Sequence, residues 1–479
     1  MPARCYASSR TKLFRMSPRY SPRAARVIAS LLAAALVSTA DAQTLDTRFP
    51  TVDGDVYAVA VHDGVLYFGG VFDAVGGEPR ANLAAVDLST ADLLDWAPGT
   101  DGTVRDLAVL SGSVYVCGDF RTLNGEDRNT LGAVDLLAGT LSTWNPRIVF
   151  PGVPGRQNGL VLSLSSDPER GRLYIGGYFI SVEGTRQANV AAFDNQGQHV
   201  AAFAASSDIP VNSVAAHQGR VYIGGPFRRV NGERRTGFAA VGADDGSVLP
   251  WTYASDFPGN ENWLHAGGAH VYAVGVVDIG TSGAHRGIRQ LDLDGNLMTW
   301  APGFFGEQDD FEAVAAVGDT LLLGGQFAIV GGSTNLALLH ASTGDALPWM
   351  PNPDGLVRDV TLSGKYLIAG GSFGTVEGQA REGLAVFVWD RPRDGHRGGE
   401  GQSTVYPVPT IGDLTLLDAK AVRLVELVSA EGAVVLSGRH GEGATLTLNV
   451  RDVQPGVYTL VGYDASGEVI RRERVVVGE

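Results

Sequence analysis

A short apolar motif recurs through most of this 479-residue chain. Its clearest copy, residues 66–72, reads Leu-Tyr-Phe-Gly-Gly-Val-Phe, with two glycines between apolar residues. Seven copies lie 46 to 59 residues apart, and they begin at Leu66, Val114, Leu173, Val221, Val271, Leu321 and Leu367. The copy at Val271 keeps one glycine and lacks the phenylalanine. A period of this length is typical of repeat architectures, in which each unit packs on its neighbours.

Each repeat contains the signals of several short strands. In the first repeat, the turn Asp63-Gly64 precedes the glycine-containing strand, and the apolar run 83–87 follows a polar loop. We expect a fourth strand to end where tryptophan stands two residues before proline, at Trp96, Trp144, Trp300 and Trp349. Small residues also suit inner strands that converge on an axis. The pattern therefore predicts an all-β chain with a seven-bladed β-propeller over residues 43–390.

The last repeat lacks its fourth strand. Its third strand, residues 384–388, runs directly into a polar segment that begins at Arg391. A segment that matches a blade end, Leu45–Pro50, stands instead before the first repeat. We therefore expect residues 43–50 to complete the seventh blade, because this would close the ring with strands from both ends of the repeat region.

Residues 1–42 have the features of an export signal. Seven basic residues precede the apolar run Val27–Val37, and the tripeptide Ala-Asp-Ala at 40–42 is a small-x-small cleavage pattern. The apolar run is too short for a transmembrane helix, and no later segment is long enough. We therefore predict a signal peptide that is cleaved before Gln43, with Met16 as an alternative start of the chain.

Charge and cysteine content argue against several classes of partner. Removal of residues 1–42 leaves 30 basic and 51 acidic residues, a formal net charge of −21. A surface this acidic repels nucleic acid and anionic lipid, so neither is an expected partner. Cys117 is then the single cysteine of the processed chain, which excludes an internal disulfide. We expect it to be an inert apolar residue within a strand.

The pattern changes beyond the repeats. Residues 391–403 are rich in arginine, glycine and acidic residues with little to bury, which is typical of a linker. Residues 404–479 then alternate short apolar runs with the turns Glu431-Gly432, Pro455-Gly456 and Ser466-Gly467. This alternation predicts a small C-terminal β-sandwich.

The repeat region resembles a known family. The string Leu45–Phe49, followed by Gly54–Val61 and Asp63–Phe72, is similar to the delta-60 repeat class of bacterial β-propellers. The resemblance covers about residues 43–390 and is weakest in the fifth repeat. Kelch-type propellers, which also pair glycines with a later tryptophan, are a neighbouring possibility. Both families imply the same fold, and neither implies a fixed activity.

The C-terminal segment resembles the type A C-terminal sorting domain of the type IX secretion system of Bacteroidetes-like bacteria. The residues that carry this resemblance include Tyr406, Pro407, Pro409, Gly456 and Tyr458, while Val408 stands where the family usually has asparagine. The resemblance implies periplasmic passage, contact with the type IX secretion machinery and removal of residues 404–479. The remainder would be released or fixed to the outer cell surface. An ordinary accessory sandwich is the alternative.

The sequence contains no recognisable catalytic, metal-binding or cofactor-binding motif. His-Glu-x-x-His, Gly-x-Ser-x-Gly and the phosphate-binding glycine loops are missing, and the histidines lack partners at metal-ligand spacing. We therefore expect no cofactor and no metal. Loops that depart from the repeat template carry additional aromatic residues, Phe257, Trp263, Phe304 and Phe305. We expect these loops to form a ligand-contacting face, because such departures are where repeat proteins can hold a binding site.

Three interpretations of function follow. The first is a secreted or cell-surface propeller that binds a protein or glycan without catalysis. The second is an extracellular polysaccharide hydrolase or lyase with its active site at the axial opening of the propeller. The third is a structural or adhesive spacer without a specific ligand. The first is the working prediction, because the sequence offers no motif for chemistry.

Overall fold

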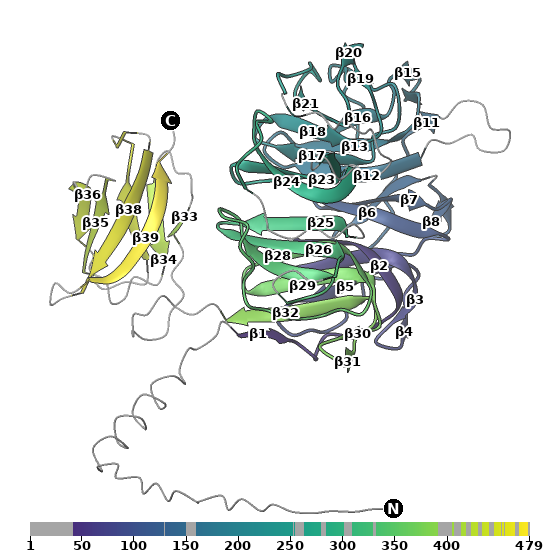
Figure 1. Cartoon of the computed structure of the whole chain (residues 1–479). Coiled ribbons are helices and arrows are strands. Elements are labelled where there is room, and N and C mark those ends of the chain that lie inside the picture. The colour runs from purple at the N-terminus through teal and green to yellow at the C-terminus, as the bar shows by residue number, and fades with distance from the viewer. Residues whose placement is uncertain are drawn as a thin grey trace, which may run out of the picture. The chain divides into compact units, whose positions relative to one another are not determined.

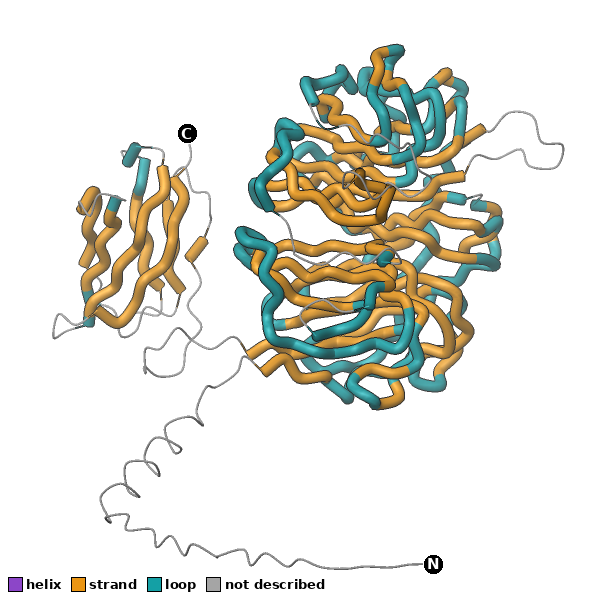
Figure 2. Tube along the Cα trace, in the orientation of Figure 1, coloured by secondary structure: helices purple, strands orange, loops and turns teal. Residues whose placement is uncertain are grey.

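The computed structural model describes residues 42–128, 130–149, 160–251, 253, 263–278, 284–300, 309–328 and 332–390, then 405–406, 413–417, 423–429, 434–439, 445–451, 453–454, 456–464 and 469–477. The chain divides into two compact units, Asp41–Arg391 and a second that takes in Pro392–Glu479. Every regular element within the described residues is a strand, which confirms the predicted all-β class (Figure 1, Figure 2). No helix in this described part is long and apolar enough to span a membrane.

Seven antiparallel sheets follow one another along the described residues of the first unit. In each, a first strand pairs with a second, and the second also pairs with a third. In chain order these strands are β2 (Val52–His62), β3 (Val65–Val75) and β5 (Leu83–Asp87); β6 (Thr103–Leu110), β7 (Ser113–Asp119) and β10 (Leu131–Asp135); β12 (Leu160–Asp167), β13 (Arg172–Tyr178) and β16 (Val190–Asp194); β17 (Ser213–His217), β18 (Arg220–Gly224) and β21 (Phe238–Gly242); β22 (Trp263–Gly267), β23 (His270–Asp278) and β24 (Ala284–Asp292); β25 (Asp310–Val317), β26 (Thr320–Gln326) and β27 (Leu336–His340); β28 (Leu356–Ser363), β29 (Tyr366–Ser372) and β32 (Leu384–Asp390).

Short strands make smaller pairings in the loops that follow the second strands and, for β11, in the segment between β10 and β12. They are β4 (Glu78–Pro79), β8 (Thr122–Leu123), β9 (Glu126–Asp127), β11 (Ile148–Val149), β14 (Ser181–Val182), β15 (Thr185–Arg186), β19 (Arg229–Val230), β20 (Glu233–Arg234), β30 (Thr375–Val376) and β31 (Gln379–Ala380). The fourth strand expected in each repeat is reduced to a single bridge in the first six sheets, as between Val86 and Leu93. In five of these six sheets the sequence reaches a proline within five residues of the bridge, and proline cannot donate to a strand ladder; after His199 the next proline is Pro210.

The first strands of the seven sheets contact one another in order. β2 contacts β6, β6 contacts β12, and the series continues through β17, β22, β25 and β28. β28 in turn contacts β2, so the series of sheets returns to its beginning. The first strands therefore gather around one common region, and each sheet has two sheets as neighbours.

The paired glycines lie in the middle strand of the sheets and permit close approach of neighbouring chains. A Cβ atom added to Gly324 would stand 2.6 Å from Val357 Cγ1 of the next sheet, and one added to Gly370 would stand 2.6 Å from Val56 Cγ1. The second glycine of a pair faces its own sheet, since a Cβ on Gly325 would collide with the carbonyl oxygen of Asp310. Steric contact on both sides therefore requires these glycines.

The repeated tyrosines and tryptophans join neighbouring sheets. Trp96 packs edge-on against Tyr67 with 5.2 Å between ring centroids, and its indole N–H donates to Asp135 O of the second sheet at 3.0 Å. The Tyr67 hydroxyl donates to Leu136 O, also of the second repeat, at 3.0 Å. Trp144 makes the corresponding ring contact and N–H bond one sheet further on. These aromatic residues belong to the scaffold, because they bury apolar area and satisfy their polar atoms between sheets.

β1 (Ala42–Leu45) supplies the outer strand of the seventh sheet. It pairs with β32 in antiparallel register, from Ala42 opposite Asp390 to Leu45 opposite Phe387, and Figure 1 shows purple β1 beside light-green β32. The guanidinium of Arg381, which is buried, donates to Phe49 O at 2.5 Å and to Asp46 O at 3.4 Å. Backbone pairing and one buried cation thus hold the start of this unit against its end.

The second unit contains two antiparallel sheets among its described residues. One consists of β33 (Val405–Tyr406), β34 (Asp413–Leu417) and β37 (Thr445–Asn449); the other consists of β36 (Val434–Arg439), β35 (Leu424–Val428), β38 (Gly456–Tyr463) and β39 (Val469–Val477). Leu448 of β37 shares a buried apolar cluster with Val425 and Leu427 of β35 and Leu460 of β38. Residues of both sheets therefore contribute to one hydrophobic core.

Arg381→Met is expected to loosen the segment that carries β1, because the variant loses the donors to Phe49 O and Asp46 O. Loss of about 1.4 kcal/mol from this attachment corresponds to about a tenfold larger population of the released segment. Tryptic cleavage after Arg48, followed by mass spectrometry, should therefore accelerate by roughly tenfold.

Arg80→Met is the matched control. Arg80 holds the equivalent place in the first repeat, but its donors reach Pro79 O and Leu94 O within that repeat. We expect cleavage after Arg48 to be unchanged in this control. Equal cleavage rates in the two variants would show that Arg381 does not hold the N-terminal segment.

Candidate functional site

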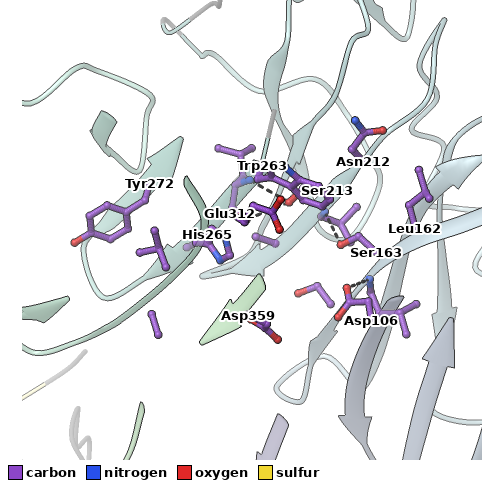
Figure 3. Close-up of a pocket in the computed structure, with 18 of the residues that line it drawn as sticks. Asp106, Leu162, Ser163, Asn212, Ser213, Trp263, His265, Tyr272, Glu312 and Asp359 are labelled. Carbon is purple, nitrogen blue, oxygen red and sulfur yellow. Dashed lines mark hydrogen bonds between the residues drawn. The ribbon is translucent and has the colours of Figure 1, made fainter. Parts of the chain in front are cut away.

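A cavity of about 570 Å³ lies where the first strands of the seven sheets meet (Figure 3). All seven sheets contribute to its lining through Tyr57; Arg105 and Asp106; residues 162–165; residues 212–216; residues 263–267; Glu312 and residues 314–316; and Arg358 and Asp359. The volume lies within the range of about 300–1,000 Å³ that is usual for small-ligand pockets. The cavity is therefore large enough to be a binding site.

β-Bulges select side chains that reach this cavity. Register shifts in five first strands leave one residue of each without a counterpart on the second strand, and these residues are Tyr57, Arg105, Leu162, Glu312 and Arg358. All five line the cavity. A bulge interrupts the alternation of side chains between the two faces of a strand and so changes the direction of the side chain at the bulge. The five sheets thereby present one tyrosine, two arginines, one leucine and one glutamate to the cavity.

The residue after the bulge joins one sheet to the next in three sheets, and Ser213 takes the same place in β17, whose pairing with β18 has no register shift. In four sheets this residue has a carboxylate or hydroxyl oxygen, and that oxygen accepts a hydrogen bond from a backbone N–H of the following first strand. The four bonds run from Leu164 N to Asp106 Oδ2 (2.7 Å), Val214 N to Ser163 Oγ (3.2 Å), Leu264 N to Ser213 Oγ (3.0 Å) and Val59 N to Asp359 Oδ2 (2.7 Å). Two of these acceptors, Asp106 and Ser163, are shown with their bonds in Figure 3.

The two aspartates each serve two N–H groups. Asp106 Oδ1 also accepts from Leu107 N at 2.7 Å, and Asp359 Oδ1 accepts from Val360 N at 2.8 Å. The sheets that precede them have alanine at the acceptor position, Ala58 and Ala313. An aspartate, with its second oxygen, can therefore satisfy the N–H of its own strand that the preceding sheet leaves without a side-chain acceptor.

Burial governs the ionisation of both carboxyls. It raises the pKa of Asp359 to about 8, and the charge of Asp106 adds to this effect while the N–H of Val59 partly offsets it. Burial also raises the pKa of Asp106 to about 6, against the hydrogen bonds from Leu164 and Leu107. The dominant cause in each case is the cost of a charge removed from water.

A polar network around Arg358 links three sheets at the cavity. The Arg358 guanidinium carbon lies 4.5 Å from the centroid of the Tyr57 ring, and one of its terminal nitrogens lies 3.4 Å from a Glu312 carboxylate oxygen. Its Nε donates to Ser372 Oγ at 3.1 Å, and this hydroxyl donates to Asp55 Oδ2 at 2.7 Å. Arg358 and Glu312 both keep part of their side chains exposed. The network therefore has polar groups within reach of a ligand.

Arg105 forms a second arginine–carboxylate ion pair. Its Nε and one terminal nitrogen both donate to Asp119 Oδ2, the Nε at 2.8 Å. The side chains of Arg105 and Asp119 are 42% and 41% exposed. At that exposure the pair contributes at most about 1 kcal/mol to stability. A pair in this position that contributes so little to stability is therefore not identified as part of the scaffold.

His265 is a neutral residue of the cavity lining. Burial lowers the pKa of this imidazole to about 4, so the ring is uncharged at neutral pH. Its Nε2 is buried and has no hydrogen-bond partner among the residues that the structure describes. Trp263, two residues earlier in β22, also lines the cavity and packs on a buried apolar cluster.

The structure describes only part of the residues singled out from the sequence. Of the expected ligand-contacting aromatics, Trp263 lines the cavity, whereas Phe257, Phe304 and Phe305 lie outside the described residues. Of the sorting residues, Tyr406 lies in β33 and Gly456 begins β38. Tyr458 is buried and its hydroxyl donates to Gln454 O at 2.7 Å, while Pro407 and Pro409 lie outside the described residues.

The bulge residues were not identified as candidates from the sequence. The signal was nevertheless present, because Val56, Val104, Val161 and Val357 are followed by tyrosine, arginine, leucine and arginine, so the residue at this position is not fixed by the repeat. Recognising this position as a candidate requires the register shift between the two strands, which the repeat pattern alone does not show. A variable residue inside an otherwise uniform strand is the feature to search for.

Comparisons with known proteins do not assign a family. No family model matches this chain, and no curated protein matches it. Among solved structures, the computationally designed Ika8 protein aligns with 73% of this chain and 100% of its own, at 13% identity and a TM-score of 0.43. The extracellular domain of a hybrid two component system from B. thetaiotaomicron aligns over 91% of this chain and 59% of its own, at 12% identity and a TM-score of 0.45.

A fungal alcohol oxidase of the AA5 family, solved in complex with copper, aligns over 91% of this chain and 100% of its own, at 16% identity and a TM-score of 0.44. Similarity at this level assigns neither a fold nor a function to the chain. No group of three or more histidine, cysteine, aspartate or glutamate side chains that could hold a metal occurs among the residues described here.

The ionisation of Asp359 makes the free energy of unfolding depend on pH, over a range above that in which His265 titrates. Its folded-state pKa of about 8 lies above the unfolded value of about 3.9, so the stability it contributes is complete below pH 3.9 and is lost as the pH rises through 8. From about pH 6.5 to about pH 8.5 the free energy of unfolding should fall by about 2 kcal/mol, as measured by denaturant titration. His265 titrates below this window.

Asp359→Asn should flatten this pH dependence, because the amide does not ionise. The control is Asp354→Asn, since hydrogen bonds from the N–H groups of Thr375 and Gly374 hold the pKa of Asp354 below its usual value. That variant should retain the wild-type slope between about pH 6.5 and about pH 8.5. A wild-type slope in Asp359→Asn would mean that another group causes it.

Proposed function

We propose that this protein is an exported seven-bladed β-propeller that binds an extracellular ligand in its axial cavity without catalysis. The succession of first-strand contacts from β2 to β28 and back to β2 supports the propeller arrangement. The pairing of β1 with β32 supports closure of the seventh blade by residues 43–50. The binding role rests on the cavity rather than on the fold, because propellers serve many functions.

The observation that carries the binding role is the set of side chains at the bulge positions. Four side chains connect the sheets: Asp106, Ser163 and Asp359, which follow bulges, and Ser213 of β17, which does not. Tyr57 and Arg105 accept none of these inter-sheet N–H bonds, and a charged residue costs more to bury here than alanine or serine. Large polar and aromatic side chains that converge on a cavity are typical of a ligand-binding site.

One set of groups favours the alternative, a polysaccharide hydrolase or lyase. Carboxyl groups with raised pKa values and a neutral histidine in a cavity can act as general acids and bases. Asp106, Asp359 and His265 fit that description. However, each aspartate already accepts two backbone N–H bonds with its two oxygens. Their burial and partners are therefore explained by the joints between sheets.

Incubation with the polysaccharide and protein fractions of the native culture medium tests binding against catalysis. We expect the wild type to be retained by one fraction, with no increase in reducing ends or in unsaturated sugar products. Arg358→Ala should lose retention by about tenfold or more, because Arg358 holds both Tyr57 and Glu312.

Arg234→Ala, on the exposed short strand β20, is the control and should bind as the wild type does. Product formation that is abolished in both His265→Ala and Asp359→Asn would replace the binding proposal with the enzymatic one. Absence of retention by either fraction would favour a structural spacer.

We propose further that the signal peptide and residues 404–479 are both removed during export to the medium or the outer cell surface by the type IX secretion system. The basic and apolar order of residues 1–42 supports the first cleavage. The sequence resemblance around Tyr406 and Tyr458 supports the second, and two sheets that share one core are consistent with a sandwich.

Intact mass spectrometry of protein recovered from the medium and from washed cells tests this processing. We expect a product that begins near Gln43 and ends near residue 400, and the distribution between fractions tells release from anchoring. A product that ends at Glu479 would contradict the sorting role and leave residues 404–479 as a retained accessory domain.

A further inference from the structure

We infer that the ligand of the axial cavity is a neutral saccharide, bound through Tyr57 and the two ion pairs Arg105–Asp119 and Arg358–Glu312. This inference rests on the proposed binding function and names the class of ligand. It depends on three properties of the bulge residues: their charge balance, their partial exposure and the aromatic rings beside them.

Charge balance argues against an ionic ligand. Both guanidinium groups in the lining already have a carboxylate beside them, Asp119 for Arg105 and Glu312 for Arg358. Asp55 adds a further negative charge through its bond with Ser372. An anionic ligand would compete with these carboxylates, and the formal net charge of −15 would oppose its approach. A cationic ligand would instead meet the two guanidinium groups.

A sugar hydroxyl suits such pairs better than an ion does. Each hydroxyl donates one hydrogen bond and accepts others, so it can bind a carboxylate oxygen and a guanidinium N–H at the same time. Hydrogen bonds to charged groups are roughly twice as strong as neutral ones. Arg105, Arg358 and Glu312 line the cavity and are 42%, 30% and 24% exposed, so these three can reach a ligand, while Asp119 is the ion-pair partner of Arg105.

Aromatic rings complete the site. Tyr57 and Trp263 both line the cavity, and they belong to different sheets, β2 and β22. Arg358 lies over the Tyr57 ring at 4.5 Å and so restricts its orientation. The C–H face of a pyranose is apolar while its rim is polar, which matches an amphipathic lining of rings and ion pairs. A protein segment would need a larger contact area than one cavity provides.

Isothermal titration of the full chain with oligosaccharides tests this inference. The probes are neutral gluco-, manno-, galacto- and xylo-oligosaccharides and, for comparison, oligouronates of the same length. We expect binding to at least one neutral series, with a Kd that changes by less than about twofold between about 50 mM and about 500 mM NaCl.

Tyr57→Ala and Glu312→Gln should each weaken this binding by about tenfold or more. Glu312→Gln keeps the size of the side chain, and its melting temperature, measured in parallel, separates loss of contact from loss of fold. Arg186→Ala, on the exposed strand β15, is the control and should bind normally.

Two results would overturn the inference. One is preferential binding of an oligouronate that weakens steeply with salt, which would assign an acidic saccharide to Arg105 and Arg358. The other is the absence of binding by every saccharide series. In both cases the proposed binding function survives if a ligand from the native medium is retained by the wild type and lost in Arg358→Ala, so the two failures can be told apart.

Discussion

Backbone N–H groups of the first strands impose a constraint on the whole arrangement. A first strand has a strand partner on one side only, so these N–H groups face the common region where the strands gather and need an acceptor there. Side chains of the preceding sheet supply it, as Asp359 does for Val59 and Ser163 does for Val214. Four sheets thereby bind the first strand of the sheet that follows.

The same constraint explains why the candidate site is separate from the scaffold. In three sheets the residue after the bulge makes the joint to the next sheet, and the bulge residue itself is not required for that joint. Arg105 and Arg358 could therefore take the place of smaller residues without loss of the inter-sheet bonds of Asp106 and Asp359. A repeat protein can vary a binding surface in this way while the contacts between its units stay unchanged.

Closure depends on both ends of the first unit. β1 comes immediately after the expected signal peptide, and it pairs with β32, which immediately precedes the expected linker. Arg381 is buried against the carbonyl oxygens of Asp46 and Phe49 and ties the same two regions. The seventh sheet is therefore completed by residues 42–45, which come from the opposite end of the repeat region.

The sequence by itself determined the all-β class, the number of repeats and the residues of most strands, because glycine pairs, turns and apolar runs act over a few residues. The structure adds that β1 pairs with β32. Only the tertiary structure brought Tyr57, Arg105, Glu312 and Arg358 together, since they lie in four different sheets. Their meeting depends on a register shift within each sheet and on contacts between sheets, neither of which a local pattern encodes. Trp263, the predicted contact residue that lies within the described part of the chain, lines the same cavity because it also lies on a first strand.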